Sequence, residues 1–134
     1  MVSPHTALIY TMVLVSAADG DMTDAELAVI GDITRSLPVF KDYDSEKLTR
    51  VAGDCAELLS ADDGFATVLG MIAQALPERL RETAYVLACD VAAADLSAEQ
   101  EELRLLEMLR HHLKVDRLVT VAIERAARAR HATV

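Results

Sequence analysis

The sequence predicts an all-α protein built as one compact bundle of about seven helices. Apolar residues make up 52% of the 134 residues, whereas aromatic residues make up only 4% and Trp is absent. The apolar set is mostly Ala, Leu and Val, which favours helices that pack closely through small side chains. No segment shows the period-two alternation of a strand, so no sheet is expected. We therefore expect a single domain over residues 1–134, with one core.

Capping residues and prolines define the first helices. Ser3 caps the first helix, which runs to about Ala18. Thr23 and Glu26 form a capping box that opens the second helix, and Pro38 closes it. The apolar stripe expected on the second helix consists of Leu27, Ile30, Ile33 and Leu37. Both segments are therefore predicted as helices, the first of them strongly apolar and buried.

The same signals place the later helices. Asp44 or Ser45 caps the third helix, and Pro77 marks the start of the fifth. Ser97 with Gln100 forms a second capping box, which opens the sixth helix. The expected helical ranges are about 4–18, 24–37, 45–59, 64–76, 77–93, 98–113 and 116–130. Short connections join all of these segments, as expected in a helical bundle.

Two stretches of the chain repeat each other at a constant offset of 76 positions. Residues 17–27 and 93–103 each contain Ala-Ala-Asp, followed by a Glu-Leu pair that begins seven residues after the Asp. The matched apolar pairs around them are Val15/Val91, Ile30/Leu106, Ile33/Leu109, Leu37/Leu113 and Val39/Val115. A fixed offset with matched apolar positions indicates an internal repeat. We predict two copies of one helix hairpin, about 5–40 and 81–116, related by a pseudo-twofold axis.

The repeat supplies an Asp/Glu pair on each of two helix-turn corners. Capping explains Glu26 and Glu102, but Asp19 and Asp95 follow helix C-termini, where the dipole disfavours a carboxylate. A bound cation would relieve that repulsion, and so would a local hydrogen bond from the following turn. Carboxylate oxygens suit Ca²⁺ or Mg²⁺, whereas Zn²⁺ prefers His and Cys. If the copies pack face to face, the four carboxylates converge and form a cation site.

Two sequence motifs carry a family resemblance. The first is Ala-Ala-Asp-Gly at 17–20 with a Glu seven residues after the Asp, on a helical hairpin repeated near both ends of the chain. The second copy reads Ala-Ala-Asp-Leu, with Leu96 where the family pattern has Gly. The second is Ala-Leu-Pro-Glu-Arg-Leu-Arg-Glu-Thr-Ala at 75–84, running into Val-Ala-Ala-Ala-Asp at 91–95. Over roughly residues 8–116 the chain resembles the tellurite-resistance TerB-like family.

The resemblance implies a fold, a site and a biological role. It implies an all-helical domain of about seven helices, with an acidic cluster proposed to bind a divalent metal. By motif position, the metal ligands are Asp19 and Glu26 in the first copy and Asp95 and Glu102 in the second. Asp21 is an additional ligand in the same corner. The implied role lies in the response to tellurite and to general chemical stress. We expect the chain to act in a stress-response complex with a protein partner.

The charge of the chain is unevenly distributed. The net charge is −9, yet residues 104–134 hold seven Lys/Arg against three Asp/Glu, a balance of +4. The acidic body argues against nucleic-acid binding as the main task and favours cations or basic partners. We interpret the basic residues of the last helix, capped by Asp116, as a solvated face. Contact of this helix with an acidic surface, including a second copy in a homodimer, is left open.

The sequence contains no recognisable catalytic motif. Neither a metalloprotease helix, a nucleophile elbow nor a phosphate-binding loop is present, so we expect a non-enzymatic protein. Cys55 and Cys89 have no CxxC spacing and are predicted to be buried free thiols in a reducing compartment. The apolar stretch 6–18 is too short to span a bilayer, and a cytoplasmic location is expected. The favoured function is cation binding in a stress-response complex; the alternative is a metal-free protein-interaction scaffold.

Overall fold

The computed structural model describes residues 1–17, 22–94 and 100–134, without the side chains of 100–102. These residues form seven α-helices and no strand, which confirms the predicted all-α class. The helices are α1 (Pro4–Ser16), α2 (Asp24–Ser36), α3 (Leu48–Leu59), α4 (Gly64–Ala75), α5 (Arg81–Ala94), α6 (Gln100–Leu113) and α7 (Arg117–Arg130). Short 3₁₀ turns occupy Pro38–Phe40, Ser45–Lys47 and Glu78–Leu80. None of the helices among these residues has the length and apolar character needed to cross a membrane.

Helix α1 lies at the centre of the bundle. Every residue from Ala7 to Ser16 is buried, because the helix is apolar on all sides. Two of these residues are polar: the Thr11 hydroxyl donates to the Ala7 carbonyl at 2.8 Å, and the Ser16 hydroxyl donates to the Met12 carbonyl at 3.0 Å. Both hydroxyls are thus satisfied within the helix itself. The predicted buried first helix is confirmed, although it ends at Ser16 rather than near Ala18.

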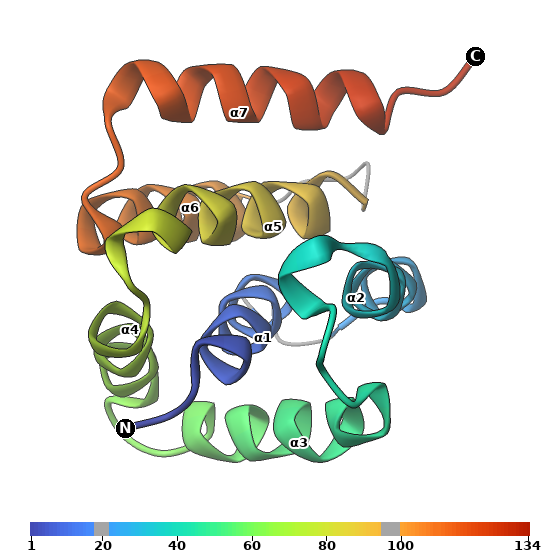
Figure 1. Ribbon diagram of the computed structural model, residues 1–134. Coiled ribbons are helices and arrows are strands. Elements are labelled where there is room, and N and C mark those ends of the chain that lie inside the picture. Colours follow the sequence, from blue (N-terminus) through green and yellow to red (C-terminus); the bar gives the residue numbers. More distant parts are fainter. Residues whose placement is uncertain (18–21, 95–99) are drawn as a thin grey trace.

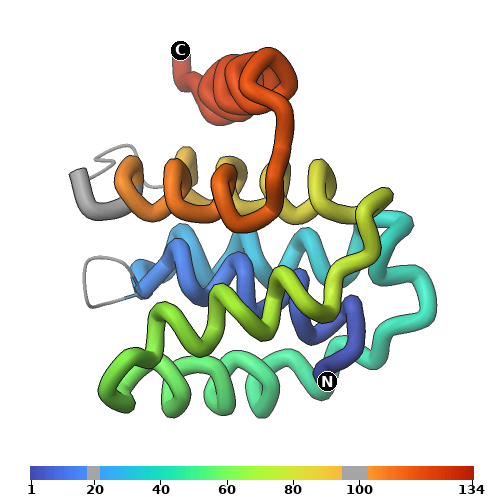
Figure 2. Tube along the Cα trace, turned by 90° about the vertical axis from the view of Figure 1, so that its left-hand side faces the viewer, coloured from blue at the N-terminus to red at the C-terminus, as the bar shows by residue number. Residues whose placement is uncertain are grey.

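The other helices surround α1 in layers (Figure 1). Helix α3 packs against one side of α1, and α5 packs against another, with α4 and α2 beside them. Helix α7 lies on the outer side of α5 and does not reach α1 in the views of Figures 1 and 2. The core is therefore a single cluster around α1, and α7 is the most peripheral helix.

The predicted core of α2 needs one correction. Ile30 and Ile33 are buried as expected, but Leu27 is 51% exposed and Glu26 is fully buried. Glu26, Ile30 and Ile33 share one helix face by their spacing, so the inward stripe passes through the carboxylate instead of the leucine. On α4, Phe65 is 37% exposed, and the buried face of the helix runs through Val68, Leu69 and Ile72.

The matched apolar positions of the proposed repeat have similar burial. Val15 and Val91 are both fully buried, and Leu27 and Leu103 are both exposed. The other four matched pairs are buried or partly buried in both copies. This agreement is compatible with two related hairpins, α1–α2 and α5–α6, but a common ancestry of the two hairpins stays a prediction.

Truncation of a core leucine on α6 tests this description of the core. Leu109 is 0% exposed, so Leu109→Ala is expected to lower the free energy of unfolding by about 2–5 kcal/mol through lost burial and an unfilled cavity. Leu103→Ala on the same helix removes a side chain that is 55% exposed, and should change stability by less than about 0.5 kcal/mol. Urea unfolding measures both; equal losses would contradict the assignment.

Arg81 joins the ends of two helices that are far apart in the sequence. Its Nη1 donates to the Leu113 carbonyl and its Nη2 to the Ala73 carbonyl, each at 3.3 Å. A cation is favourable there because both carbonyls belong to last turns of helices. Arg81→Met is expected to lower the free energy of unfolding by about 1–3 kcal/mol, measured by urea unfolding. Exposed Arg79→Met is the control, and a loss as large as that of Arg81→Met would contradict this role.

Candidate functional site

The first acidic corner lies between α1 and α2. Helix α1 ends at Ser16, and the Ala17 amide that follows donates to the Val13 carbonyl at 2.9 Å. Asp19 and Asp21, two of the predicted metal ligands, lie outside the described residues. The structure therefore describes this corner from its two helix ends, and Glu26 is the predicted ligand whose side chain it places.

Glu26 and Thr23 form the predicted capping box at the start of α2. The Glu26 amide donates to Thr23 Oγ1 at 3.1 Å, and the Thr23 amide donates to Glu26 Oε1 at 2.9 Å. The Thr23 hydroxyl also donates to Glu26 Oε1, at 3.1 Å. This arrangement satisfies two amide groups that a helix N-terminus leaves free. One oxygen of the carboxylate is thereby committed to the cap.

The second oxygen of Glu26 has a different environment. The residue is 0% exposed, and Oε2 has no hydrogen-bond partner in the described part of the chain. Asp24, two residues earlier in the same turn, is exposed. Buried polar atoms almost always have a partner, and a buried carboxylate without one is costly. Glu26 is thus the one predicted ligand seen to combine full burial with a free acceptor.

The second acidic corner lies between α5 and α6. Helix α5 ends at Ala94, and Asp95 lies outside the described residues. Glu102 belongs to α6, but its side chain is not described. Ser97, the expected cap of α6, also lies outside the described residues. The structure therefore supplies the helices that bear this corner and not the positions of its carboxylates.

The helix ends that flank the two corners lie at the same end of the bundle. In Figure 2, α1 and α5 both end at the left, and α2 and α6 both begin there. This follows from packing, because α1 and α5 lie against each other and run in the same direction (Figure 2). Among residues whose side chains are described, no three His, Cys, Asp or Glu lie close enough together to hold a metal ion. A cation site formed by all five predicted ligands stays a prediction.

A second group of polar contacts, not predicted from the sequence, attaches α7 to α5. The Tyr85 hydroxyl donates to Glu124 Oε2 at 2.7 Å. Asp90 pairs with Arg130, and its Oδ1 lies 3.5 Å from His131 Nε2. The basic residues of α7 are exposed, as expected for a solvated face, and Arg130 in addition pairs with α5 of the same chain.

Burial controls the ionisation of Tyr85 and the two cysteines. Burial and the neighbouring Glu124 carboxylate raise the pKa of Tyr85, so its hydroxyl remains a donor. Cys55 and Cys89 are free and buried, as predicted, and burial raises the pKa of each thiol to about 12. Neither cysteine is a thiolate at neutral pH, so nucleophilic chemistry at these positions is not favoured.

Comparison with known proteins identifies the family. The family model described as "Tellurite resistance protein TerB" matches residues 5–125. No curated protein and no solved structure matches the chain. The match extends over nearly the whole chain, from the first turn of α1 into α7, and includes both acidic corners. The chain therefore belongs to the TerB family of tellurite-resistance proteins.

Proposed function

We propose that this TerB domain is a non-enzymatic protein that binds a divalent cation at the end of the bundle where its two acidic corners lie. The cation would join the α1–α2 and α5–α6 hairpins and fix their relative angle, within a stress-response complex. Five carboxylates are the proposed ligands: Asp19, Asp21, Glu26, Asp95 and Glu102.

The proposal rests chiefly on the unpartnered Oε2 of Glu26. A Gln at this position would complete the capping box equally well, because its carbonyl oxygen accepts the same amide. A Glu brings a charge whose burial costs several kcal/mol when nothing compensates it. The cap therefore explains Oε1 and not the charge. A cation bound at Oε2 would compensate the charge.

The chemistry of the ligands favours a hard cation. Carboxylate oxygens are the ligands that Ca²⁺ and Mg²⁺ prefer, and Ca²⁺ accepts six to eight oxygens in flexible geometry. His and Cys, which bind Zn²⁺, are not among the proposed ligands. We therefore propose Ca²⁺ or Mg²⁺ as the ion.

A metal-free interaction scaffold is the second candidate. It is favoured by the capping role of Glu26, which gives one oxygen of this carboxylate a function without a metal ion. In that case the carboxylates serve as helix caps and as solubilising charge. The two candidates differ in one measurable property, which is the response of stability to divalent cations.

Addition of Ca²⁺ or Mg²⁺ to the metal-free protein is expected to raise its melting temperature. A ligand that binds only the folded state adds about 2.7 kcal/mol when its free concentration is a hundredfold above Kd. Thermal unfolding followed by circular dichroism measures the shift, and isothermal titration gives the stoichiometry. No shift and no heat with either ion would exclude the cation site and favour the scaffold.

Glu26→Gln separates the cation role from the capping role. The variant keeps the capping acceptor and removes the buried charge, so without cation it should be as stable as wild type or more so. It should also lose the stabilisation by Ca²⁺ or Mg²⁺, measured by the same melting experiment. Asp24→Asn removes one charge from the same turn at an exposed position, and should keep the cation response. An undiminished response in Glu26→Gln would rule out Glu26 as a ligand.

The corner aspartates are tested together. Asp19→Asn combined with Asp95→Asn is expected to abolish the cation-dependent rise in melting temperature and to leave the helical circular dichroism unchanged. Each Asn is close in size to the Asp that it replaces, so the loss would report charge rather than packing. Retention of the full response would show that the cation is bound elsewhere.

A further inference from the structure

Helix α7 rests on α5 and leaves its flank toward α6 uncovered. Its buried residues, Thr120 and Ala127, belong to the face that packs on α5. Within the described residues, α6 and α7 make almost no contact with each other, although both pack against α5. Figure 1 shows α7 lying along the layer formed by α5 and α6. The result is a groove with α5 as its floor and with α6 and α7 as its walls.

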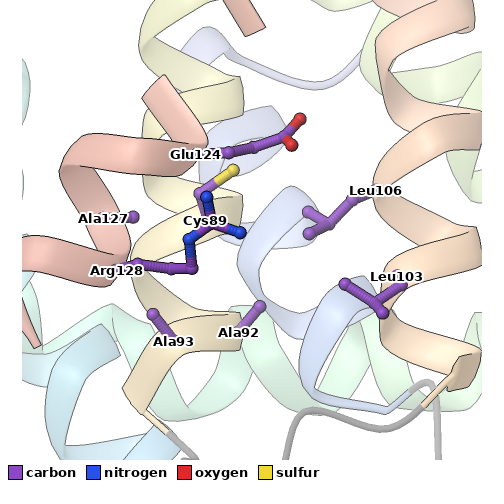
Figure 3. A pocket seen from close by; sticks show the side chains of 8 residues that line it. All are labelled: Cys89, Ala92, Ala93, Leu103, Leu106, Glu124, Ala127 and Arg128. Carbon is purple, nitrogen blue, oxygen red and sulfur yellow. The ribbon is translucent and has the colours of Figure 1, made fainter. Parts of the chain in front are cut away.

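Two adjoining hollows form this groove. The first has a volume of about 120 Å³ and is mostly apolar, with Cys89 and Ala92 of α5 at its floor (Figure 3). The second has a volume of about 220 Å³ and is more polar, with the Tyr85–Glu124 contact at its base. Leu103, Leu106 and Glu124 line both hollows, so the two are continuous. The groove therefore has an apolar end and a polar end.

The walls of the groove expose apolar side chains. Leu103 of α6 is 55% exposed at its rim. On α7, Val121 is half exposed and lines neither hollow. It lies four residues after Arg117 and seven before Arg128, so the three residues share one face of the helix. The first hollow is close in volume to an apolar cavity of about 150 Å³ that binds benzene, so it could hold only a small molecule. Such a molecule would leave the exposed part of Leu103 in water. A macromolecular ligand would cover the exposed apolar side chains.

The charge of the groove selects the partner. Arg110, Arg117 and Arg128 line it, against Glu107 and Glu124. The Glu107 carboxylate lies 3.6 Å from Arg110, and Glu124 accepts from Tyr85. Arg117 and Arg128 have no ion pair among the described residues. A hydrogen bond from the neutral Tyr85 leaves the Glu124 charge in place, so the charged residues that line the groove balance to +1 among the described residues, in a chain whose net charge is −9.

We propose that the groove between α6 and α7 binds an acidic amphipathic helix of a partner protein. Its apolar residues would enter the hollow over Cys89 and cover Leu103, while its carboxylates would meet Arg117 and Arg128. A second copy of this chain is a poorer occupant, because a twofold contact through the groove would bring the same arginines together. The proposal does not depend on the cation site, since none of these side chains is a proposed ligand of the cation.

A pair of synthetic peptides tests the proposal. Each has about 15 residues, a lactam bridge that keeps it helical, and Leu at helical spacing along one face. One peptide carries Glu on its polar face and the other carries Lys. The Glu peptide is expected to bind at least about tenfold more tightly, and more weakly as salt is added. Fluorescence anisotropy measures binding, with and without Ca²⁺, so that a failure of the cation site is seen separately.

Matched variants locate the binding surface. Arg117→Glu with Arg128→Glu should weaken the Glu peptide by at least about tenfold and improve the Lys peptide. Arg104→Glu with Arg125→Glu changes the same net charge at exposed positions that do not line the groove, and should change binding much less. Leu103→Ala should weaken both peptides, whereas exposed Leu118→Ala on α7 should not. Melting temperatures confirm that each variant is folded.

Chemical-shift mapping gives the opposing outcomes. The Glu peptide is expected to shift amide signals in 85–93, 103–110 and 117–128. Four results would overturn the proposal: no shifts at millimolar peptide, equal binding of both peptides, shifts confined to other helices, or weakening by the control pair as large as by the groove pair. A further result would overturn the proposal and assign the groove to a second copy of the chain. In that result, the same amide signals shift as the concentration of the free protein rises, and addition of peptide does not change them.

Discussion

The burial of α1 on every side constrains the rest of the structure. A helix with no polar face cannot border water, so other helices must cover it all round. Helices α3 and α4 do so on one side, and α5 with α2 on another. Because α5 runs in the same direction as α1, the C-terminal ends of the two helices lie at one end of the bundle (Figure 2). The common end of the two acidic corners is thus a consequence of how α1 is covered.

Glu26 shows how packing and chemistry conflict at that end. It occupies the position at which the inward stripe of α2, through Ile30 and Ile33, reaches the first turn. An apolar residue there would extend the core, and the capping box alone would accept a neutral Gln. A buried charge is the least stable of these choices unless a partner compensates it. Proteins usually depart from the local rules of folding at functional sites. Glu26 departs from the rule that a buried charge has a compensating partner.

The sequence predicted the helices better than it predicted their contacts. Ser3, Thr23 and Asp116 cap helices as expected, because capping depends on a few neighbouring residues. The inward face of α2 was wrong at Leu27, since one residue of rotation decides which side chain is buried and only packing fixes that rotation. For the acidic site, the sequence singled out Glu26, but burial of its free oxygen depends on tertiary structure. The pairing of Asp90 with Arg130 joins distant segments and left no local signal.

Polar bridges explain why α7 stays on α5 and leaves the groove open. The Tyr85–Glu124 and Asp90–Arg130 contacts lie five residues apart on α5 and six apart on α7, so the two helices advance by similar lengths between them. Such a pair fixes both the direction and the register of α7 along α5. Between the two bridges the contact is made by small residues such as Ala127, which allow a close approach. Both bridges run from α7 to α5, and among the described residues no side-chain hydrogen bond or ion pair runs from α7 to α6. The groove between α6 and α7 therefore follows from the attachment of α7 to α5.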